Sequence, residues 1–99
     1  MTERLDVDTF RPHVGTTFWL ALEDGALELV LFEVTEPGGD EPRAAELPPQ
    51  FSLYFRGPPH PILSQRIYHL DHDELGGLDL FLVPISTGAE GTVYEAAFA

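Results

Sequence analysis

The fold is decided by residues 17–35, which read TFWLALEDGALELVLFEVT. Apolar residues alternate along both halves of this segment, on either side of an Asp-Gly pair at Asp24 and Gly25. Such a pair between two alternating runs predicts a hairpin, because its second position readily takes a positive φ. Strict alternation in the second strand gives one face made of Leu27, Leu29, Leu31 and Glu33. Because the other face is also largely apolar, we expect a strongly curved strand within a barrel or between two packed layers.

Further along the chain, four segments repeat the period of two that is typical of strands. They are residues 51–56, 66–72, 78–85 and 92–98. We expect turns at residues 76–77 and 86–91, and we expect Pro84 to place the end of its strand at an edge or a bulge. The sequence thus predicts an all-β fold, a compact antiparallel β-barrel or a two-layer sandwich of about six strands.

Two stretches depart from this pattern. Residues 5–14 predict a short N-terminal helical turn with Asp6 and Asp8 as capping residues, and Gly15 ends it. Residues 36–50 hold four prolines, two glycines and four acids, which predicts a mobile acidic loop. Because 99 residues are about one domain's worth of chain, we expect a single β domain over residues 1–99.

The composition excludes several classes of partner. Seventeen acidic residues against five arginines give a net charge of −12, which repels nucleic acids and anionic membranes. The longest run without a charged residue, 12–22, is far shorter than the ~20 residues that span a bilayer. The chain has no cysteine, and its first residues do not form an apolar signal segment. We therefore expect a soluble, cytoplasmic protein.

The aromatic residues are more informative than the polar ones. Eleven rings exceed the roughly six or seven that a core of this size accommodates at native packing density. Some rings are therefore covered by another layer of the same chain, or they form an interaction surface. The second alternative predicts what we call the aromatic surface, which consists of Trp19, Tyr54, Arg56, Pro58 and Phe81.

A group of histidines and acids near residue 70 is the densest polar cluster. We call it the histidine cluster, and it consists of His60, His69, Asp71 and His72. Strand geometry places His69 and Asp71 on one face and points His72 away. A third ligand for a metal could come from His60 in the proline-rich loop or from His13, although the spacing requires neither. The alternative is a solvated strand end. Because the chain has no G-x-S-x-G elbow and no phosphate-binding loop, we expect no catalytic residue and no cofactor.

Four blocks of sequence carry a family resemblance: residues 10–18, 51–58, 75–84 and 94–98. They resemble a family of small bacterial domains classified as domain of unknown function 6916. The resemblance covers nearly the whole chain, and residues 36–50 match least. It implies a stand-alone domain, and some members are associated with genes for phage-tail-like or secreted structural proteins. An accessory or assembly role is therefore implied, without an activity, a cofactor or a catalytic residue.

These observations predict a non-enzymatic protein-interaction or assembly-accessory module of a bacterial complex, such as a phage-tail-like one. It would bind through the aromatic surface, and its acidic charge favours a partner with a basic surface. A second copy of the chain is the alternative partner. The alternative function is a small-ligand-binding or metal-binding β-barrel that uses the histidine cluster.

Overall fold

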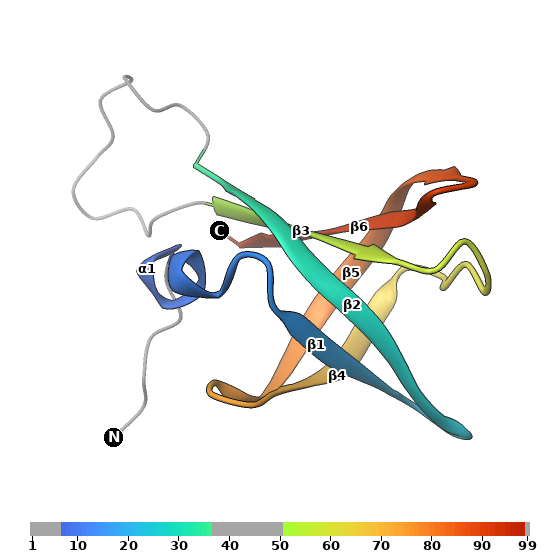
Figure 1. The fold of residues 1–99 in the computed structure, drawn as a ribbon, viewed down its shortest axis with the longest axis horizontal. Helices are drawn as coiled ribbons and strands as arrows, with labels where there is room; N and C mark the ends of the chain where they lie inside the picture. The colour runs from blue at the N-terminus through green and yellow to red at the C-terminus, as the bar shows by residue number, and fades with distance from the viewer. Residues whose placement is uncertain (1–6, 37–50, 99) are drawn as a thin grey trace.

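Antiparallel strands close into a barrel in the computed structural model of the chain, which describes residues 7–36 and 51–98. The strands are β1 (Thr17–Leu22), β2 (Gly25–Thr35), β3 (Phe51–Gly57), β4 (Arg66–His72), β5 (Gly76–Gly88) and β6 (Gly91–Phe98). They follow one another around the barrel in the order β1-β2-β3-β6-β5-β4, and β4 pairs with β1 to close it (Figure 1). The all-β prediction is confirmed, and the architecture is the barrel rather than the sandwich.

A short helical segment lies at one end of the barrel (Figure 1). It consists of the α-helix α1 (Val7–Phe10) and the 3₁₀-helix η1 (Arg11–His13), as the sequence predicts. Its anchor is Phe10, which is fully buried with its ring 6.0 Å from that of Phe51 and 5.8 Å from that of Phe98. No helix among residues 7–36 and 51–98 is long and apolar enough to cross a membrane. Asp6, and all of the predicted mobile loop except Glu36, lie outside the described residues.

The inward row of every strand forms the core. Its buried members on the strands are Phe18, Leu20, Leu29, Leu31, Phe51, Leu53, Phe55, Leu70, Leu80, Leu82, Tyr94 and Ala96. Tyr94 brings one hydroxyl group into this apolar set, and the backbone N–H of Leu63 donates to it at 3.0 Å. Every buried polar side-chain atom of the described residues has a hydrogen-bond partner.

The strict alternation predicted for β2 is wrong after Leu31. The pairing of β2 with β3 shifts by one residue between Leu31 and Glu33, so Phe32 forms a bulge. The extra residue turns Glu33 outward and brings Val34 against the core. A bulge of this kind also bends the strand, which is how an eleven-residue strand follows the curvature of the barrel.

Strand β5 is longer than its local sequence predicts. Gly76 and Gly77 belong to the strand rather than to a turn, and the hairpin to β6 turns only at residues 89–90. Pro84 does not end the strand: the register shifts between Pro84 and Ser86, so the missing proline N–H falls in a bulge. The predicted bulge is confirmed, and the turn predicted over residues 86–91 is confined to residues 89–90.

Candidate functional site

The histidine cluster is divided by the alternation of β4. His69 and Asp71 lie on the outer face, as predicted, whereas His72 points the other way and is 7% exposed. His60 lies in the β3–β4 loop, beside a small hollow of about 270 Å³ that Ile62 and the β5–β6 hairpin also line. In the part of the chain that the structure describes, no three histidine or acidic side chains are placed to hold a metal ion.

His69 is held between two carboxylates. Its Nδ1 lies 2.9 Å from Oδ1 of Asp79 on β5, and its Nε2 lies 3.1 Å from Oδ1 of Asp71. The ring fits closely over Gly77, where an added Cβ would come within 2.8 Å of the ring carbon Cε1. The hydrogen bond with Asp79, and that with Asp71, raise the pKa of His69 above its ordinary value against the opposing effect of burial. Nδ1 of His69 thus joins β4 to β5 through Asp79, whereas Nε2 holds Asp71 of the same strand.

The buried side chain of His72 connects the β4–β5 turn to the segment that follows η1. Its Nε2 lies 2.9 Å from Oγ1 of Thr16, and the Thr16 hydroxyl donates to the carbonyl oxygen of His13 at 2.6 Å. Its Nδ1 accepts from the backbone N–H groups of Glu74 and Leu75, at 3.0 and 3.2 Å. These contacts assign the neutral tautomer with the proton on Nε2. Burial, and then the charge of nearby His13, lower the pKa of His72.

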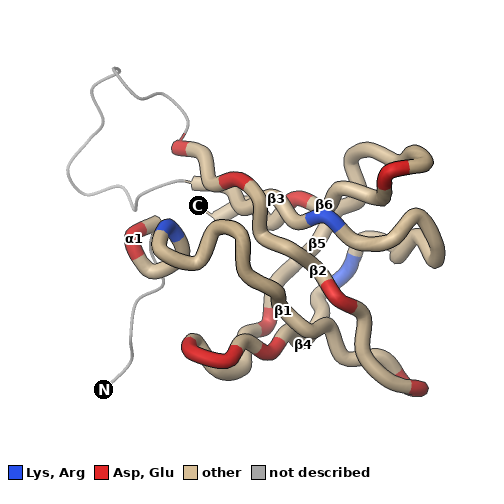
Figure 2. The backbone as a smooth tube through the Cα atoms, viewed as in Figure 1, with Lys and Arg blue, Asp and Glu red and all other residues tan. Residues whose placement is uncertain are grey.

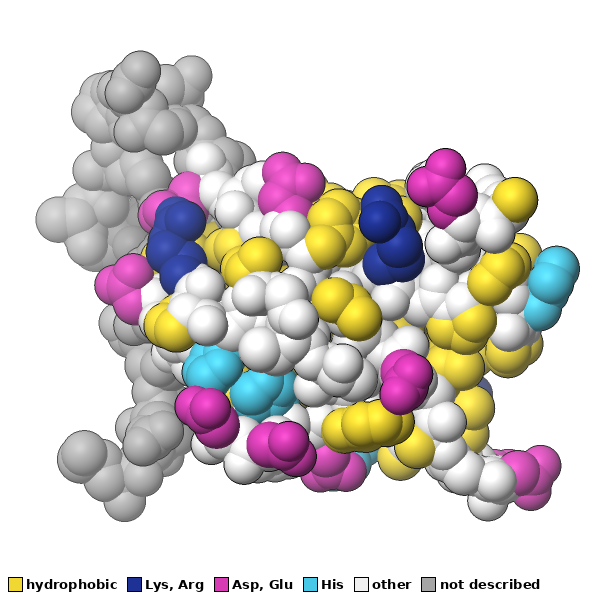
Figure 3. All heavy atoms as spheres, in the orientation of Figure 1, with side chains coloured by type: hydrophobic (Ala, Val, Ile, Leu, Met, Phe, Trp, Pro, Cys, Tyr) yellow, Lys and Arg dark blue, Asp and Glu magenta, His cyan; other side chains and the backbone are white. Residues whose placement is uncertain are grey.

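A wider hollow of about 640 Å³ crosses the outer faces of β1, β2 and β3. We call it the Trp19 groove, and it is lined by Trp19, Ala26, Leu27, Glu28, Val30, Arg56, Gly57 and Pro58. The ladder builds it, because Trp19 lies opposite Glu28 and Val30 lies opposite Arg56. Figure 3 shows hydrophobic side chains on this face with acidic side chains among them.

Two apolar side chains of the groove are exposed to solvent. Trp19 is 40% exposed and Val30 is 37% exposed. Alternation forces this position on Trp19, because its neighbours Phe18 and Leu20 are both fully buried. Arg56 is fixed differently: its guanidinium lies 4.6 Å from the centre of the Phe32 ring, in a cation–π contact.

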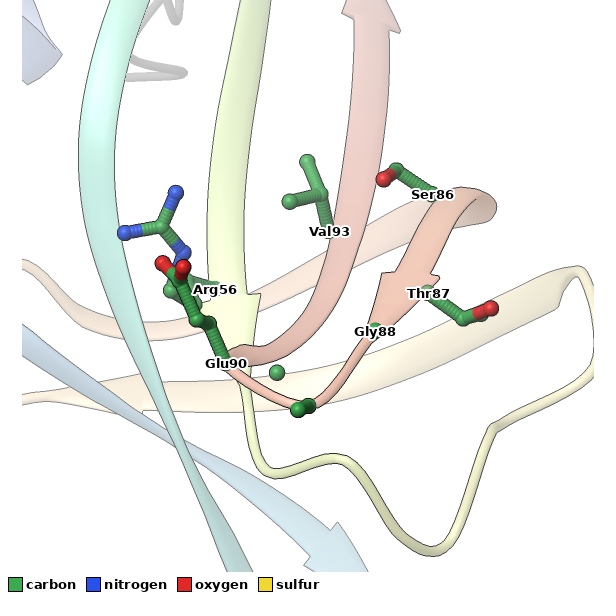
Figure 4. A pocket seen from close by; sticks show the side chains of 8 residues that line it. Arg56, Ser86, Thr87, Gly88, Glu90 and Val93 are labelled. Carbon is green, nitrogen blue, oxygen red and sulfur yellow. The ribbon is translucent and has the colours of Figure 1, made fainter.

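Arg56 also borders a second hollow of about 290 Å³, beside the β5–β6 hairpin. In Figure 4 the Glu90 side chain extends toward Arg56, whereas the Thr87 side chain points away from it. The hairpin comes close here, since a Cβ on Gly91 would lie 2.4 Å from the carbonyl oxygen of Gly57. Arg56 and Glu90 are the charged residues that line this hollow.

The aromatic surface is not continuous. Trp19, Arg56 and Pro58 line the Trp19 groove. Tyr54 adjoins it through Phe32, with the two ring centres 6.5 Å apart, and it is half-buried with its hydroxyl donating to Glu95 at 3.3 Å.

Phe81 belongs to a different patch of the outer face. It is 50% exposed on β5 and pairs across the ladder with Ile67 of β4, which is 65% exposed. The pair formed by His69 and Asp79 lies between this patch and the row of Trp19. Phe81 is therefore separated from the other residues of the aromatic surface, because the outer face of a closed barrel turns away from strand to strand.

Glu28 and Val30 line the groove without having been predicted from the sequence. The signal for them was present, because the Asp-Gly hairpin fixes the register that puts Trp19 opposite Glu28. The alternation places Val30 on the second apolar face of its strand, but nothing in the sequence indicates that this side chain is exposed.

The comparisons with known proteins bear on the whole chain. A family model described as a domain of unknown function (DUF6916) matches residues 5–98. No curated protein matches the chain, and no solved structure matches it. Because the family model covers the helical segment and all six strands of the barrel, the chain belongs to this domain-of-unknown-function family, DUF6916.

Proposed function

We propose that this chain is a non-enzymatic protein-interaction module that binds its partner through the Trp19 groove. The observation that carries the proposal is an indole 40% exposed and a valine 37% exposed in one hollow of about 640 Å³ that Arg56 also lines. Tryptophan and arginine are the residues most enriched among those that dominate binding energy at protein interfaces. An open hollow with apolar walls is suited to a protruding side chain of another protein.

The groove is built on rigid elements, which supports the same proposal. Trp19 lies in the middle of β1, between two buried residues, and Arg56 is held over Phe32. Gly57 lets β3 pack closely on the core, since a Cβ there would come within 2.6 Å of the Leu29 side chain. Side chains that are already fixed lose little entropy on binding, so their contacts contribute more to affinity.

The charge of the chain supports a partner with a basic surface. The net charge of −12 attracts such a surface over the range of the screened field and speeds the encounter. Our proposal includes a cytoplasmic location and an accessory role in the assembly of a bacterial complex, such as a phage-tail-like one. The resemblance of the sequence blocks to the family supports that part.

Site-specific photo-cross-linking in cells tests the groove. A photoreactive phenylalanine analogue at Val30 should cross-link a partner protein, whereas the same analogue at Ile67, on the Phe81 patch, should not. Adding Trp19→Ala to the Val30 probe should abolish the product. With the identified partner purified, Trp19→Ala should weaken binding by about 30-fold, the size expected for a dominant interface residue. Equal cross-linking from both positions, or a product that survives Trp19→Ala, would refute the proposal.

A further inference from the structure

Trp19 lies between two carboxylates on the outer face of the barrel. In the ladder it is directly opposite Glu28 of β2 on one side and Asp71 of β4 on the other. All three side chains are exposed. Residues directly opposite one another across antiparallel strands have Cβ atoms about 5 Å apart, which brings both carboxylates within reach of a group resting on the indole. Figure 2 shows acid-bearing positions on β2 and β4, the two neighbours of β1.

The two carboxylates differ in how they are held. Oδ1 of Asp71 lies 3.1 Å from Nε2 of His69, which orients this carboxylate beside the indole. Glu28 makes no ion pair with another residue of the described part of the chain. An aromatic face between two negative groups is the arrangement that attracts a cation, and tryptophan is the best of the aromatic side chains for this purpose.

We propose that Trp19, Glu28 and Asp71 form a binding site for an arginine side chain of the partner protein. This inference rests on the proposed function, and it names the partner's chemistry. The planar guanidinium stacks on the exposed indole, and its N–H groups donate to the two carboxylates. Arginine fits better than lysine, because a planar group with several fixed donors can stack and bind carboxylates at the same time.

Arg56, on the far side of the groove, determines which end of the groove a cation can occupy. Arg56 lies opposite Val30, one row along from Trp19, and it repels a second cation there. The arginine of the partner therefore belongs at the Trp19 end, and an apolar or acidic neighbour belongs near Arg56. This polarity, together with the net charge of −12, matches a basic partner surface with a local order of charges rather than a uniformly basic one.

The chain offers a direct probe of this site, because Trp19 is its only tryptophan. The full-length protein is titrated at physiological salt with a blocked Gly-Ser-Arg-Ser-Gly peptide, and the indole N–H signal of Trp19 is followed by NMR. We expect a saturable shift. Peptides with citrulline or with lysine in place of arginine serve as ligand controls, because citrulline keeps the planar shape without the charge. Each should bind at least about threefold more weakly.

Glu28→Gln should weaken the arginine peptide by about threefold, whereas Asp8→Asn should leave its affinity unchanged. Asp8 is exposed on α1, so this control removes the same charge away from the groove. Circular dichroism verifies that both variants keep the fold. If Asp8→Asn weakens binding as much as Glu28→Gln, the peptide senses only net charge and the site is refuted. Equal binding of the citrulline peptide refutes it as well, and equal binding of the lysine peptide refutes the assignment to arginine.

The test separates this inference from the proposed function. A cross-link from Val30 that depends on Trp19, together with no peptide binding, would refute the arginine site and leave the interaction module standing. Peptide binding without any cross-link would support the arginine site and refute the proposed role of the groove in cells.

Discussion

Replacing His72 with alanine should remove the buried connection between the β4–β5 turn and the segment that follows η1. Three hydrogen bonds are lost, those with Thr16 and with the backbone N–H groups of Glu74 and Leu75. At a net ~1 kcal/mol each, they sum to about 3 kcal/mol of unfolding free energy. The ring also packs on Phe18, with the ring centres 4.4 Å apart, and the loss of this packing adds to the cost.

Urea unfolding followed by circular dichroism and by Trp19 fluorescence measures the loss. His60→Ala is the matched control, because His60 is exposed in a loop, and it should change the unfolding free energy by less than about 0.5 kcal/mol. Thr16→Val keeps the His72 ring and removes the hydroxyl group that contacts both His72 and the carbonyl oxygen of His13, so it should cost about 2 kcal/mol. A loss below about 1 kcal/mol for His72→Ala, or an equal loss for His60→Ala, would refute the reasoning.

The same residue makes stability depend on pH in a defined direction. The folded protein lowers the pKa of His72 from 6.5, mainly through burial, so the unfolded chain binds its proton first as the pH falls. The contribution of neutral His72 to stability is therefore fully present above the unfolded pKa. It decreases as the pH falls from the unfolded pKa to the folded pKa. As the pH falls below 6.5, the wild-type protein should therefore lose more stability than His72→Ala. An identical slope in both proteins would contradict the assignment.

Three further changes test other parts of the structure. The raised pKa of His69 means that its contribution to stability is present below pH 6.5 and is lost as the pH rises through the folded pKa. The urea midpoint should therefore decrease less with rising pH in His69→Gln than in the wild type, and an equal decrease in both proteins would contradict the two-carboxylate arrangement. Gly57→Ala should cost about 1–2 kcal/mol in thermal unfolding through overpacking against Leu29, and a neutral effect would show that the Leu29 side chain moves freely. Tyr94→Phe should cost about 1 kcal/mol by removing the acceptor of the Leu63 N–H, and an unchanged urea midpoint would show that water replaces it.

Local sequence was sufficient for the strands and for the first hairpin. The alternation around Asp24 and Gly25 predicts β1 and β2 because these strands pair with each other across one short turn, so both partners lie within the same stretch of sequence. Closure of the barrel carried no such signal. It depends on the pairing of Trp19 with Asp71, two residues far apart in the chain whose neighbours give no hint of contact.

The errors occurred where the ladder overrides local preference. Gly76 and Gly77 are turn residues by propensity, but both belong to β5, and the missing side chain of Gly77 lets the strand pass beneath His69. Pro84 was expected to end its strand or to sit in a bulge, and the bulge absorbs it because the partner strand β6 continues. In each case the deciding contact is with a residue on another strand.

The candidate site was predicted in part. The outward parity of Trp19 follows from the buried residues on either side of it, so its exposure could be inferred. Its separation from Phe81 could not be inferred, because the alternation tells which face of the sheet a side chain occupies and not the direction of that face on a curved sheet. The role of Asp71 beside Trp19 needed the closed barrel, so no reading of the local sequence could have supplied it.

The number of paired positions differs between neighbouring strands of the barrel. β1 and β4 share only two paired positions, whereas β1 and β2 share six. Local opening of the barrel should therefore begin between β1 and β4, where the fewest paired positions hold two neighbouring strands together. Trp19 and Asp71 are one of those two pairs. A partner that binds across Trp19 and Asp71 would hold β1 and β4 together. Its binding should therefore slow amide hydrogen exchange along both strands.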